Sequence, residues 1–391
     1  MPTLIHHMQP RNFLSFGPDN AGIDLQPLNL LIGPNGSGKS NLIEAISLMR
    51  ATAKDLCEVV LRGGGVADWI WKGQPTSAAT LEWVVAASDD RPLLRHVIEF
   101  GSAPWVFVLD DERVENATAD ADEASPDFYY RYQRGQPVMN RKQEGQPRQL
   151  TKDTVEPFQS ILAQRRDPFS FPELCTLAWN YERIRIYREW TFGRNAVFRT
   201  PQQTDMRNDR LEEDFSNLGL FLNRLKTHYP AAKRAILAGL QVLYDGVTDF
   251  EIAIQQRTVQ VFFTEGDFVI PATRLSDGTL RYLCLLAILC DPTPPPLICL
   301  EEPELGLHPD VLPNLADLLI AASERTQLIV TTHSDILVDA MTERPESVVI
   351  CEKHNGCTEM KRLSKPELVV WLEKYRLGQL WIDGQLGGKR W

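Results

Sequence analysis

The sequence predicts an α/β fold on the strength of three observations. First, the apolar run Leu28–Ile32 leads into a glycine-rich turn, and a helical pattern follows from Asn41. Second, two later apolar runs, 297–300 and 327–332, each end in polar residues, which is typical of buried strands in a core sheet. Third, between 81 and 132, short runs rich in β-branched and aromatic residues are separated by turn residues. This third pattern predicts an antiparallel β-subdomain beside the core sheet.

Further elements are expected along the chain from the period of the apolar residues and from the turn residues between them. We expect strands over 81–86, 94–100, 105–109 and 128–132, helices over 154–165 and 171–179, a strand over 184–190, helices over 216–228 and 231–244, strands over 250–255 and 259–264, a helix over 280–290, a strand over 297–300, a helix over 311–322 and a strand over 327–332. The acidic tract Asp120–Asp127 is expected to be a solvated loop, and the polar stretch Asn140–Gln149 a linker.

The glycine-rich turn has the pattern of a P-loop, which reads Gly33-Pro34-Asn35-Gly36-Ser37-Gly38-Lys39-Ser40 and precedes Asn41. Its glycines let backbone N–H groups curve around phosphate oxygens, and the helix start adds the positive end of its dipole. Lys39 is predicted to reach the β- and γ-phosphates, and Ser40 to ligate Mg²⁺. We therefore expect residues 33–41 to bind ATP with Mg²⁺. The alternative, a turn without function, fits the strand–turn–helix context poorly.

Composition bounds the class of protein. Hydrophobic residues make up 43% of the 391 residues, as in an ordinary globular protein. The longest apolar run, Tyr282–Cys290, is far shorter than the roughly 18 residues that a membrane span needs, and the N-terminus lacks signal-peptide features. Seven cysteines without a C-x-x-C pair argue for a reducing compartment, so we expect a cytoplasmic location and no membrane partner. The net charge of −11 argues against a surface coated for nucleic acid but allows a local basic groove.

Three segments allow two interpretations each. The segment Arg11–Phe16 could carry groups to a nucleotide base or be a plain edge strand. Residues 181–210 mix arginines with aromatic residues, which suits phosphate contact and base stacking, but the simpler interpretation, which we favour, is a strand whose arginines pair with local acids. Residues 351–357 hold Cys351, His354 and Cys357, which could suggest a metal site, although the segment also fits two short strands around a turn.

A second group of polar residues follows later apolar elements. Ser276 and Gly278 stand directly before the predicted helix 280–290, and this arrangement forms another anion site. Glu301 and Glu302 end the predicted strand 297–300, where carboxylates are placed for Mg²⁺ and water, since buried acids without such partners are costly. His333 ends the strand 327–332, where an imidazole can hydrogen-bond a γ-phosphate.

The motifs, in this order, resemble those of the ATP-binding-cassette superclass. They are the P-loop, Leu-Ser-Asp-Gly-Thr at 275–279, Leu-Ile-Cys-Leu-Glu-Glu-Pro-Glu at 297–304, Leu-Gly-Leu-His-Pro at 305–309 and Thr-Thr-His-Ser at 331–334. Within this superclass the chain is most similar to the soluble SMC/RecF-like and OLD-like AAA-type ATPases, a similarity to which residues 12–16, 377–381 and 387–391 also contribute. The resemblance implies a P-loop NTPase fold with an ABC-type ATPase core, an antiparallel β-subdomain and a helical insertion. It covers the middle, roughly 80–245, only loosely.

The resemblance also implies a role for each motif residue. Lys39 is then the phosphate lysine, Ser40 the Mg²⁺ ligand, and Glu301 the Walker B acid that supports the metal. Glu302 becomes the general base and His333 the switch histidine. Ser276 and Gly278 become signature residues that complete the site of the opposite protomer in a head-to-tail dimer, and residues 304–308 form the loop that couples the two sites.

Two departures from the family pattern stand in this sequence. Transport cassettes usually carry aspartate where Glu301 stands, although OLD-like relatives use a pair of glutamates there. The signature is Leu-Ser-Asp-Gly-Thr rather than Leu-Ser-Gly-Gly-Gln, which bears on the strength of the dimer. For the Q-loop glutamine, Gln74 is the candidate.

The predicted organisation has three parts. Residues 1–145 hold the first part of the ATPase core with the β-subdomain, residues 146–245 a mainly helical insertion, and residues 246–391 the second part of the core. We expect no nuclease domain in this chain, because the tail after His333 is short, and expect any nuclease partner to be a separate chain.

The expected function is ATP hydrolysis that gates a homodimer, as a switch in DNA repair, chromosome handling or anti-phage defence. One alternative is the ATP-binding subunit of a membrane transporter, against which the long separation of Lys39 from Ser276 argues. Another is a module that binds ATP without hydrolysing it.

Overall fold

The computed structural model of the chain describes residues 3–74, 78–88, 91–101, 107–119, 126–133, 135–140, 147–149, 154–190, 193 and 196–387. The chain divides into two compact units. The N-terminal unit extends to residue 184 and also includes 349–363 and the chain from 386 on. The C-terminal unit comprises 185–348 and 364–385. The division predicted at 1–145, 146–245 and 246–391 stays a prediction, and its first boundary lies outside the described residues.

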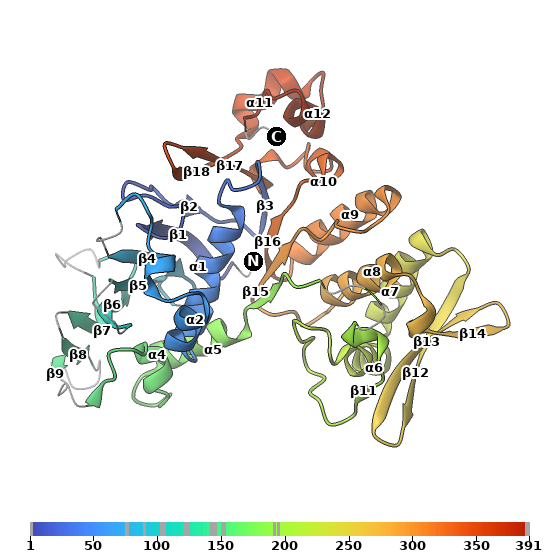
Figure 1. The fold of residues 1–391 in the computed structure, drawn as a ribbon, viewed down its shortest axis with the longest axis horizontal. Helices are drawn as coiled ribbons and strands as arrows, with labels where there is room; N and C mark the ends of the chain where they lie inside the picture. The colour runs from blue at the N-terminus through green and yellow to red at the C-terminus, as the bar shows by residue number, and fades with distance from the viewer. Residues whose placement is uncertain are drawn as a thin grey trace. The chain divides into compact units, whose positions relative to one another are not determined.

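The N-terminal unit mixes a P-loop strand and helix with a larger antiparallel sheet (Figure 1). Its elements are β1 (Ile5–Arg11), β2 (Ile23–Asp24), β3 (Leu28–Ile32), α1 (Lys39–Thr52), α2 (Leu56–Arg62), α3 (Val66–Trp69), β4 (Ala79–Val85), β5 (Leu94–Phe100), β6 (Leu109–Asn116), β7 (Phe128–Gln133), β8 (Gln136–Asn140), β9 (Pro147–Gln149), α4 (Ile161–Gln164), α5 (Pro172–Arg183), β17 (Val348–His354) and β18 (Cys357–Arg362).

The strand that leads into the P-loop is fully buried, as its sequence predicts. All five residues of β3 are buried, and α1 begins after the loop that follows it. In the sheet, β17 lies beside β3, with β18 on its other side, so two segments far apart in the sequence meet here. Strands β17 and β18 pair antiparallel around Asn355 and Gly356, whose φ values of 51° and 83° fit a tight hairpin turn. The strand interpretation of residues 351–357 is therefore the one that the structure shows.

The antiparallel β-subdomain is confirmed, in the strand order β2-β1-β4-β5-β6-β7-β8-β9. One strand was placed wrongly by the sequence pattern, since β6 begins at Leu109, where the predicted strand 105–109 ends. Positions 105 and 106 lie outside the described residues. A further strand, β9, lies within the predicted linker 140–149, whose residues 141–146 lie outside the described part of the chain, as do 120–125 of the acidic tract.

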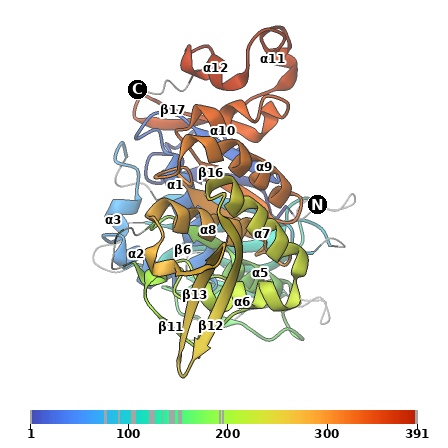
Figure 2. The same cartoon turned by 90° about the vertical axis from the view of Figure 1, so that its right-hand side faces the viewer.

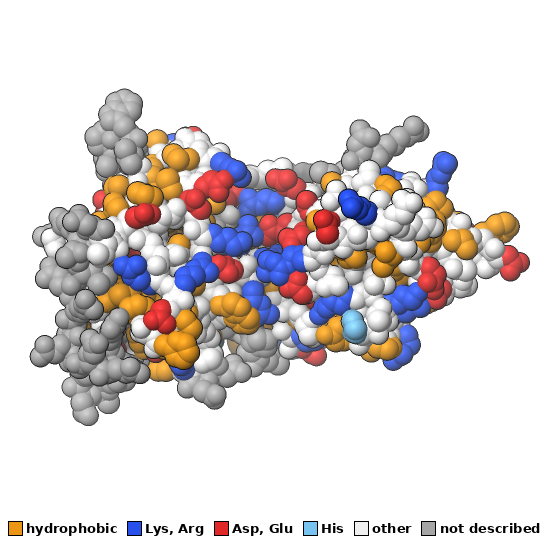
Figure 3. Space-filling view, turned by 90° about the horizontal axis from the view of Figure 1, so that it is seen from below, with side chains coloured by type: hydrophobic (Ala, Val, Ile, Leu, Met, Phe, Trp, Pro, Cys, Tyr) orange, Lys and Arg blue, Asp and Glu red, His pale blue; other side chains and the backbone are white. Residues whose placement is uncertain are grey.

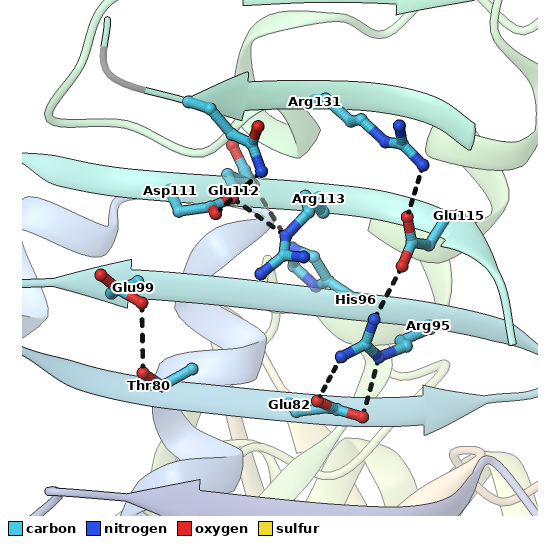
Figure 4. Close-up of polar contacts among 11 residues, drawn as sticks. Thr80, Glu82, Arg95, His96, Glu99, Asp111, Glu112, Arg113, Glu115 and Arg131 are labelled. Carbon is cyan, nitrogen blue, oxygen red and sulfur yellow. Dashed lines mark hydrogen bonds and ion pairs between the residues drawn. The ribbon is translucent and has the colours of Figure 1, made fainter. Parts of the chain in front are cut away.

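Strand β6 could not be predicted from apolar residues, because it is rich in charged side chains that pair with side chains of the neighbouring strands (Figure 4). Arg95 donates to both carboxylate oxygens of Glu82, at 2.8 and 2.7 Å, and to Glu115 at 2.8 Å. Arg131 donates to the other oxygen of Glu115 at 3.2 Å. The alternating charges run across β4, β5, β6 and β7, so cross-strand ion pairs replace apolar contacts on this face.

The other face of this sheet buries a polar network. The Glu112 carboxylate accepts hydrogen bonds from the Ser160 hydroxyl at 2.5 Å and the Ile161 amide at 2.9 Å, and lies 3.3 Å from His96 Nε2. The hydroxyl of Tyr181, on α5, lies 3.4 Å from His96 Nδ1. Ser160 also caps α4, so the helix predicted from residue 154 forms only from Ile161.

Replacing Glu112 with alanine is expected to lower the free energy of unfolding by about 3 kcal/mol, because it leaves the Ser160 hydroxyl and the Ile161 amide buried without their acceptor. Chemical denaturation measures the loss. Glu99→Ala is the matched control, since Glu99 lies on the opposite face and burial, with nearby Asp111, raises the pKa of its carboxyl. That control should change stability little, and equal losses in the two variants would contradict the role given to Glu112.

The C-terminal unit combines a parallel sheet, helices and an antiparallel arm (Figure 1). Its elements are β10 (Arg185–Tyr187), β11 (Gln202–Gln203), α6 (Leu218–His228), α7 (Pro230–Leu243), β12 (Val247–Gln255), β13 (Thr258–Glu265), β14 (Phe268–Pro271), α8 (Asp277–Leu289), β15 (Leu297–Glu301), α9 (Leu312–Ser323), β16 (Gln327–Thr331), α10 (Asp335–Asp339), α11 (Lys365–Leu372) and α12 (Leu377–Ile382). Strands β10, β15 and β16 are parallel neighbours.

Helix α8 is the centre of this unit. Every residue from Leu280 to Leu289 is buried, and α7 packs beside it (Figure 2). The contact is close at Gly239 of α7, where a β-carbon would lie 2.3 Å from a methyl of Leu286. The predicted helices 216–228, 231–244 and 280–290 are confirmed. The strands predicted over 250–255 and 259–264 are confirmed too, and they lie within β12 and β13.

Arginines of the segment 181–210 pair with acids, both near in the sequence, as Arg207 does with Asp209, and distant in it. Arg188 lies 3.9 Å from Glu301, and Arg199 donates to Asp277 at 2.6 Å. Tyr187 and Trp190 both stack on Phe215, with ring centroids 5.6 and 5.4 Å apart. On the face seen in Figure 3, Lys and Arg side chains lie among acidic ones. The structure thus shows ion pairs and ring stacking within the protein for these residues, while residues 191, 192, 194 and 195 lie outside the described part.

Within the described ranges, no helix is both long enough and apolar enough to cross a bilayer.

Candidate nucleotide-binding site

The P-loop takes a conformation that only glycine tolerates at several positions. Gly33, Gly36 and Gly38 have φ values of 145°, 76° and 100°. A β-carbon on Gly33 would lie 2.1 Å from the carbonyl oxygen of Cys351, so this position excludes any side chain. Asn35 and Gly36 are exposed, and the main chain of the loop is therefore open to a ligand on one side.

Lys39 lies inside the loop. Its side chain is buried, and its Nζ donates to the carbonyl oxygens of Gly33 at 2.8 Å and Pro34 at 3.0 Å. Ser40 is exposed in the first turn of α1. A buried ammonium, a glycine-rich loop at a helix start and an exposed hydroxyl fit a triphosphate with its divalent cation.

A second group of predicted residues meets in the C-terminal unit. Strands β15 and β16 run parallel with Glu301 opposite Thr331, so both strands end at one edge of the sheet. The carboxylate of Glu302 lies 3.6 Å from His333 Nε2, and both side chains are partly exposed. Glu301, Glu302 and His333 are thus brought together, as the motif order predicts, although their roles stay predictions.

Glu302 has a strained backbone that its neighbours hold in place. Its φ of 45° is rare for a residue with a side chain. Its amide donates to the carbonyl oxygen and to the hydroxyl of Thr331, both at 3.1 Å, and its carbonyl accepts from Arg281 at 2.6 Å. The strain places this carboxylate at the exposed edge beside His333.

Arg281 is a residue that the sequence patterns missed, and it lies against Trp190, one of the aromatic residues of the segment 181–210. Arg281 is 1% exposed on the apolar helix α8, and its guanidinium lies 4.3 Å from the ring centre of Trp190. Trp190 Nε1 in turn donates to the carbonyl of Glu301 at 2.9 Å. A lone arginine within an apolar helix pattern was the available signal, since a buried charge needs specific partners.

Glu304 is bound differently from the two glutamates before it. One of its oxygens accepts from the Thr332 hydroxyl and from the His333 amide, both at 2.7 Å. Burial raises the pKa of its carboxyl above the ordinary value of 4.5. Glu304 therefore fixes the main chain at His333 and is a structural neighbour of the site.

The signature residues lie at the start of α8. Ser276 is exposed and caps the helix by accepting from the Thr279 amide at 3.0 Å. A β-carbon on Gly278 would lie 2.9 Å from the carbonyl oxygen of Gly306, so the signature packs against the loop 304–308. In that loop Leu305 is 53% exposed.

Gln74 is exposed as well, and its Q-loop role stays a prediction.

Comparison with known proteins decides the family. Residues 28–339 match the model of the family described as "AAA domain, putative AbiEii toxin, Type IV TA system". The chain belongs to this AAA-domain family. This match confirms the AAA-type family predicted from the motifs, and the SMC-like part of that prediction is confirmed for the fold.

Two solved structures share the fold of this AAA-domain protein. An SMC head bound to the C-winged helix domain of ScpA matches with a TM-score of 0.53 and 16% identity, over 93% of this chain and 99% of that one. The Smc head domain with a coiled coil and joint from Pyrococcus yayanosii matches with a TM-score of 0.50 and 13% identity, over 95% and 99%. These identities show the fold alone, which is the mixed α/β P-loop fold of the SMC head domains. The search of curated proteins finds no match.

Replacing Glu304 with glutamine is expected to stabilise the protein near neutral pH. Because the pKa of Glu304 is raised on folding, the folded state holds this proton to a higher pH than the unfolded chain, and stability falls as pH rises above the ordinary value. Glutamine removes that loss, so the two proteins should be equally stable near pH 4 and diverge above it. Denaturation midpoints across this range measure the effect. The surface variant Glu324→Gln is the control, and a Glu304→Gln protein less stable than wild type at neutral pH would contradict the prediction.

Proposed function

We propose that the chain binds ATP with Mg²⁺ and hydrolyses it. The observation that carries the proposal is the strained Glu302, whose carboxylate is 43% exposed and stands beside His333 at the end of β15. A strained, exposed carboxylate next to an imidazole is suited to orient water and to take its proton.

The proposed reaction uses the motif residues in separate roles. Water attacks the γ-phosphorus, the bond to the bridging oxygen breaks, and Glu302 takes the proton. Lys39 binds the β- and γ-phosphates, and His333 hydrogen-bonds the γ-phosphate. Ser40 and Glu301 would hold Mg²⁺, which neutralises charge on the phosphates. Most of the catalysis then comes from positioning and charge stabilisation.

We propose further that ATP joins two copies head to tail, with Ser276 and Gly278 of one copy completing the site of the other. Support comes from the exposed hydroxyl of Ser276 at a helix start and from the exposed Leu305 in the loop that touches Gly278. The signature at Gly278 and the loop 304–308 are in contact within one copy. A conformational change at the nucleotide site of one copy would therefore be passed to the site that its signature completes in the other copy. Hydrolysis would release the dimer, which makes the protein a nucleotide-gated switch.

Replacing Glu302 with glutamine is expected to keep ATP binding, abolish phosphate release and trap an ATP-bound dimer, because the amide cannot take the proton of water. Light scattering after size-exclusion chromatography measures the mass with and without ATP, and phosphate release is followed in the same samples. Lys39→Ala is the control and should neither bind nor dimerise.

Two results would count against this scheme. A Glu302→Gln protein that stays monomeric at saturating ATP would contradict the proposed ATP-bound dimer. Wild-type protein that binds ATP without releasing phosphate would leave the alternative of a non-hydrolysing module.

For the process that the switch controls, we propose DNA repair, chromosome handling or anti-phage defence, with DNA or a separately encoded nuclease as partner. The SMC head that shares this fold was solved with a winged-helix domain bound, and the family description names a toxin system.

Capture of the tagged protein from its native cells, with and without ATP, is expected to bring down DNA or a nuclease in the ATP-bound state. The Lys39→Ala variant is the control for dependence on nucleotide. Recovery of a membrane permease instead would favour the transporter alternative.

A further inference from the structure

A row of hydrogen bonds connects the P-loop and the first turn of α1 to the hairpin β17–β18. Asn41 Nδ2 donates to Ser15 Oγ at 2.6 Å, Ser15 Oγ lies 2.6 Å from Thr358 Oγ1, and Thr358 Oγ1 donates to the carbonyl of Ser37 at 2.9 Å. Each hydroxyl can thus donate one hydrogen bond and accept another along the chain. The two hydroxyls hold the loop main chain at Ser37 and the first turn of α1 at Asn41.

This hydroxyl pair is buried and leaves no spare room beside the loop. Thr358 is 2% exposed and Ser15 8%. A β-carbon on Gly38 would lie 2.1 Å from Thr358 Oγ1 and 2.8 Å from Ser15 Oγ. Gly38, whose φ is 100°, is therefore packed directly against both hydroxyls. Movement of the hairpin at Thr358 would release the loop at this glycine.

Ser15 is presented by a strained turn. Leu14 before it has a φ of 48°, which an L-residue of this size rarely adopts and which strains the backbone. The turn is closed by hydrogen bonds between Phe13 and Phe16 in both directions, at 3.0 and 2.7 Å. The carbonyl of Ser15 accepts from the Thr358 amide at 2.7 Å, so the two residues meet through main chain as well as side chain.

We propose that Thr358 is a positioning residue for the P-loop, and that with Ser15 it holds the loop main chain ready for a polyphosphate. The inference rests on the proposed nucleotide binding. A loop that is already ordered loses less conformational freedom when it binds, so the hydroxyl pair raises the affinity for nucleotide. The same hydroxyl in a merely structural role would affect stability and leave affinity per folded molecule unchanged.

The test compares Thr358→Val, which has the same shape without the hydroxyl, with Thr358→Ser, which keeps the hydroxyl. Hydrogen exchange of amides 36–41 in nucleotide-free protein should be roughly tenfold faster in the valine variant, as for the loss of one net hydrogen bond. The Kd for Mg-ADP by calorimetry should rise by about the same factor. The serine variant should stay near wild type in both.

Two further variants keep the test sharp. Ser15→Ala removes the other hydroxyl of the pair. It should change amide exchange of the loop and affinity for Mg-ADP in the same direction as Thr358→Val, and it serves as the test if the valine variant does not fold. Thr248→Val removes an exposed hydroxyl in the C-terminal unit and should change neither quantity.

The outcomes separate the two proposals. A folded Thr358→Val protein with wild-type exchange, or with faster exchange and unchanged affinity for Mg-ADP, overturns the inference. Wild-type protein that binds neither Mg-ADP nor Mg-ATP overturns the proposed function. In that case the exchange rates alone decide whether Thr358 positions the loop.

Discussion

The conformation of the P-loop depends on how closely its glycines approach atoms from another part of the chain. Gly33 faces the main chain at Cys351, and Gly38 faces the hydroxyls of Ser15 and Thr358. At both positions a single methyl group would collide with buried atoms that have little freedom to move. The loop therefore owes its shape to the hairpin β17–β18 as much as to its own glycine content.

Three glutamates lie within four residues, and each has different neighbours. The same type of side chain can therefore serve a different role at each of the three positions. Glu301 lies near Arg188, Glu302 is partly exposed beside His333, and Glu304 accepts a hydrogen bond from the main chain at His333. These surroundings decide what each carboxylate can contact, and burial raises the pKa of the Glu304 carboxyl, so neighbouring acids come to serve different functions. At this edge of the sheet, Glu302 is more open to water than Glu301, with 43% of its side chain exposed against 18%.

Local patterns were sufficient for the core elements and insufficient where distant partners decide. The strands β3, β15 and β16 and the helices α1 and α8 follow from apolar runs and caps, and Glu302 and His333 meet because parallel strands end at one edge. Strand β6 was misplaced because ion pairs on other strands satisfy its charges. The hydrogen bonds of Thr358 could not be predicted, because its partners Ser15 and Ser37 lie 343 and 321 residues earlier in the sequence and no local pattern indicates such a contact.

The return of residues 349–363 to the N-terminal unit has a consequence for biosynthesis. A ribosome releases β3 and the glycine turn long before it releases β17 and β18. Until the hairpin emerges, β3 lacks a neighbouring strand on one side, and the turn lacks the atoms that shape it. The nascent chain must therefore hold an apolar strand with an open edge for most of its synthesis, which is a state that chaperones recognise.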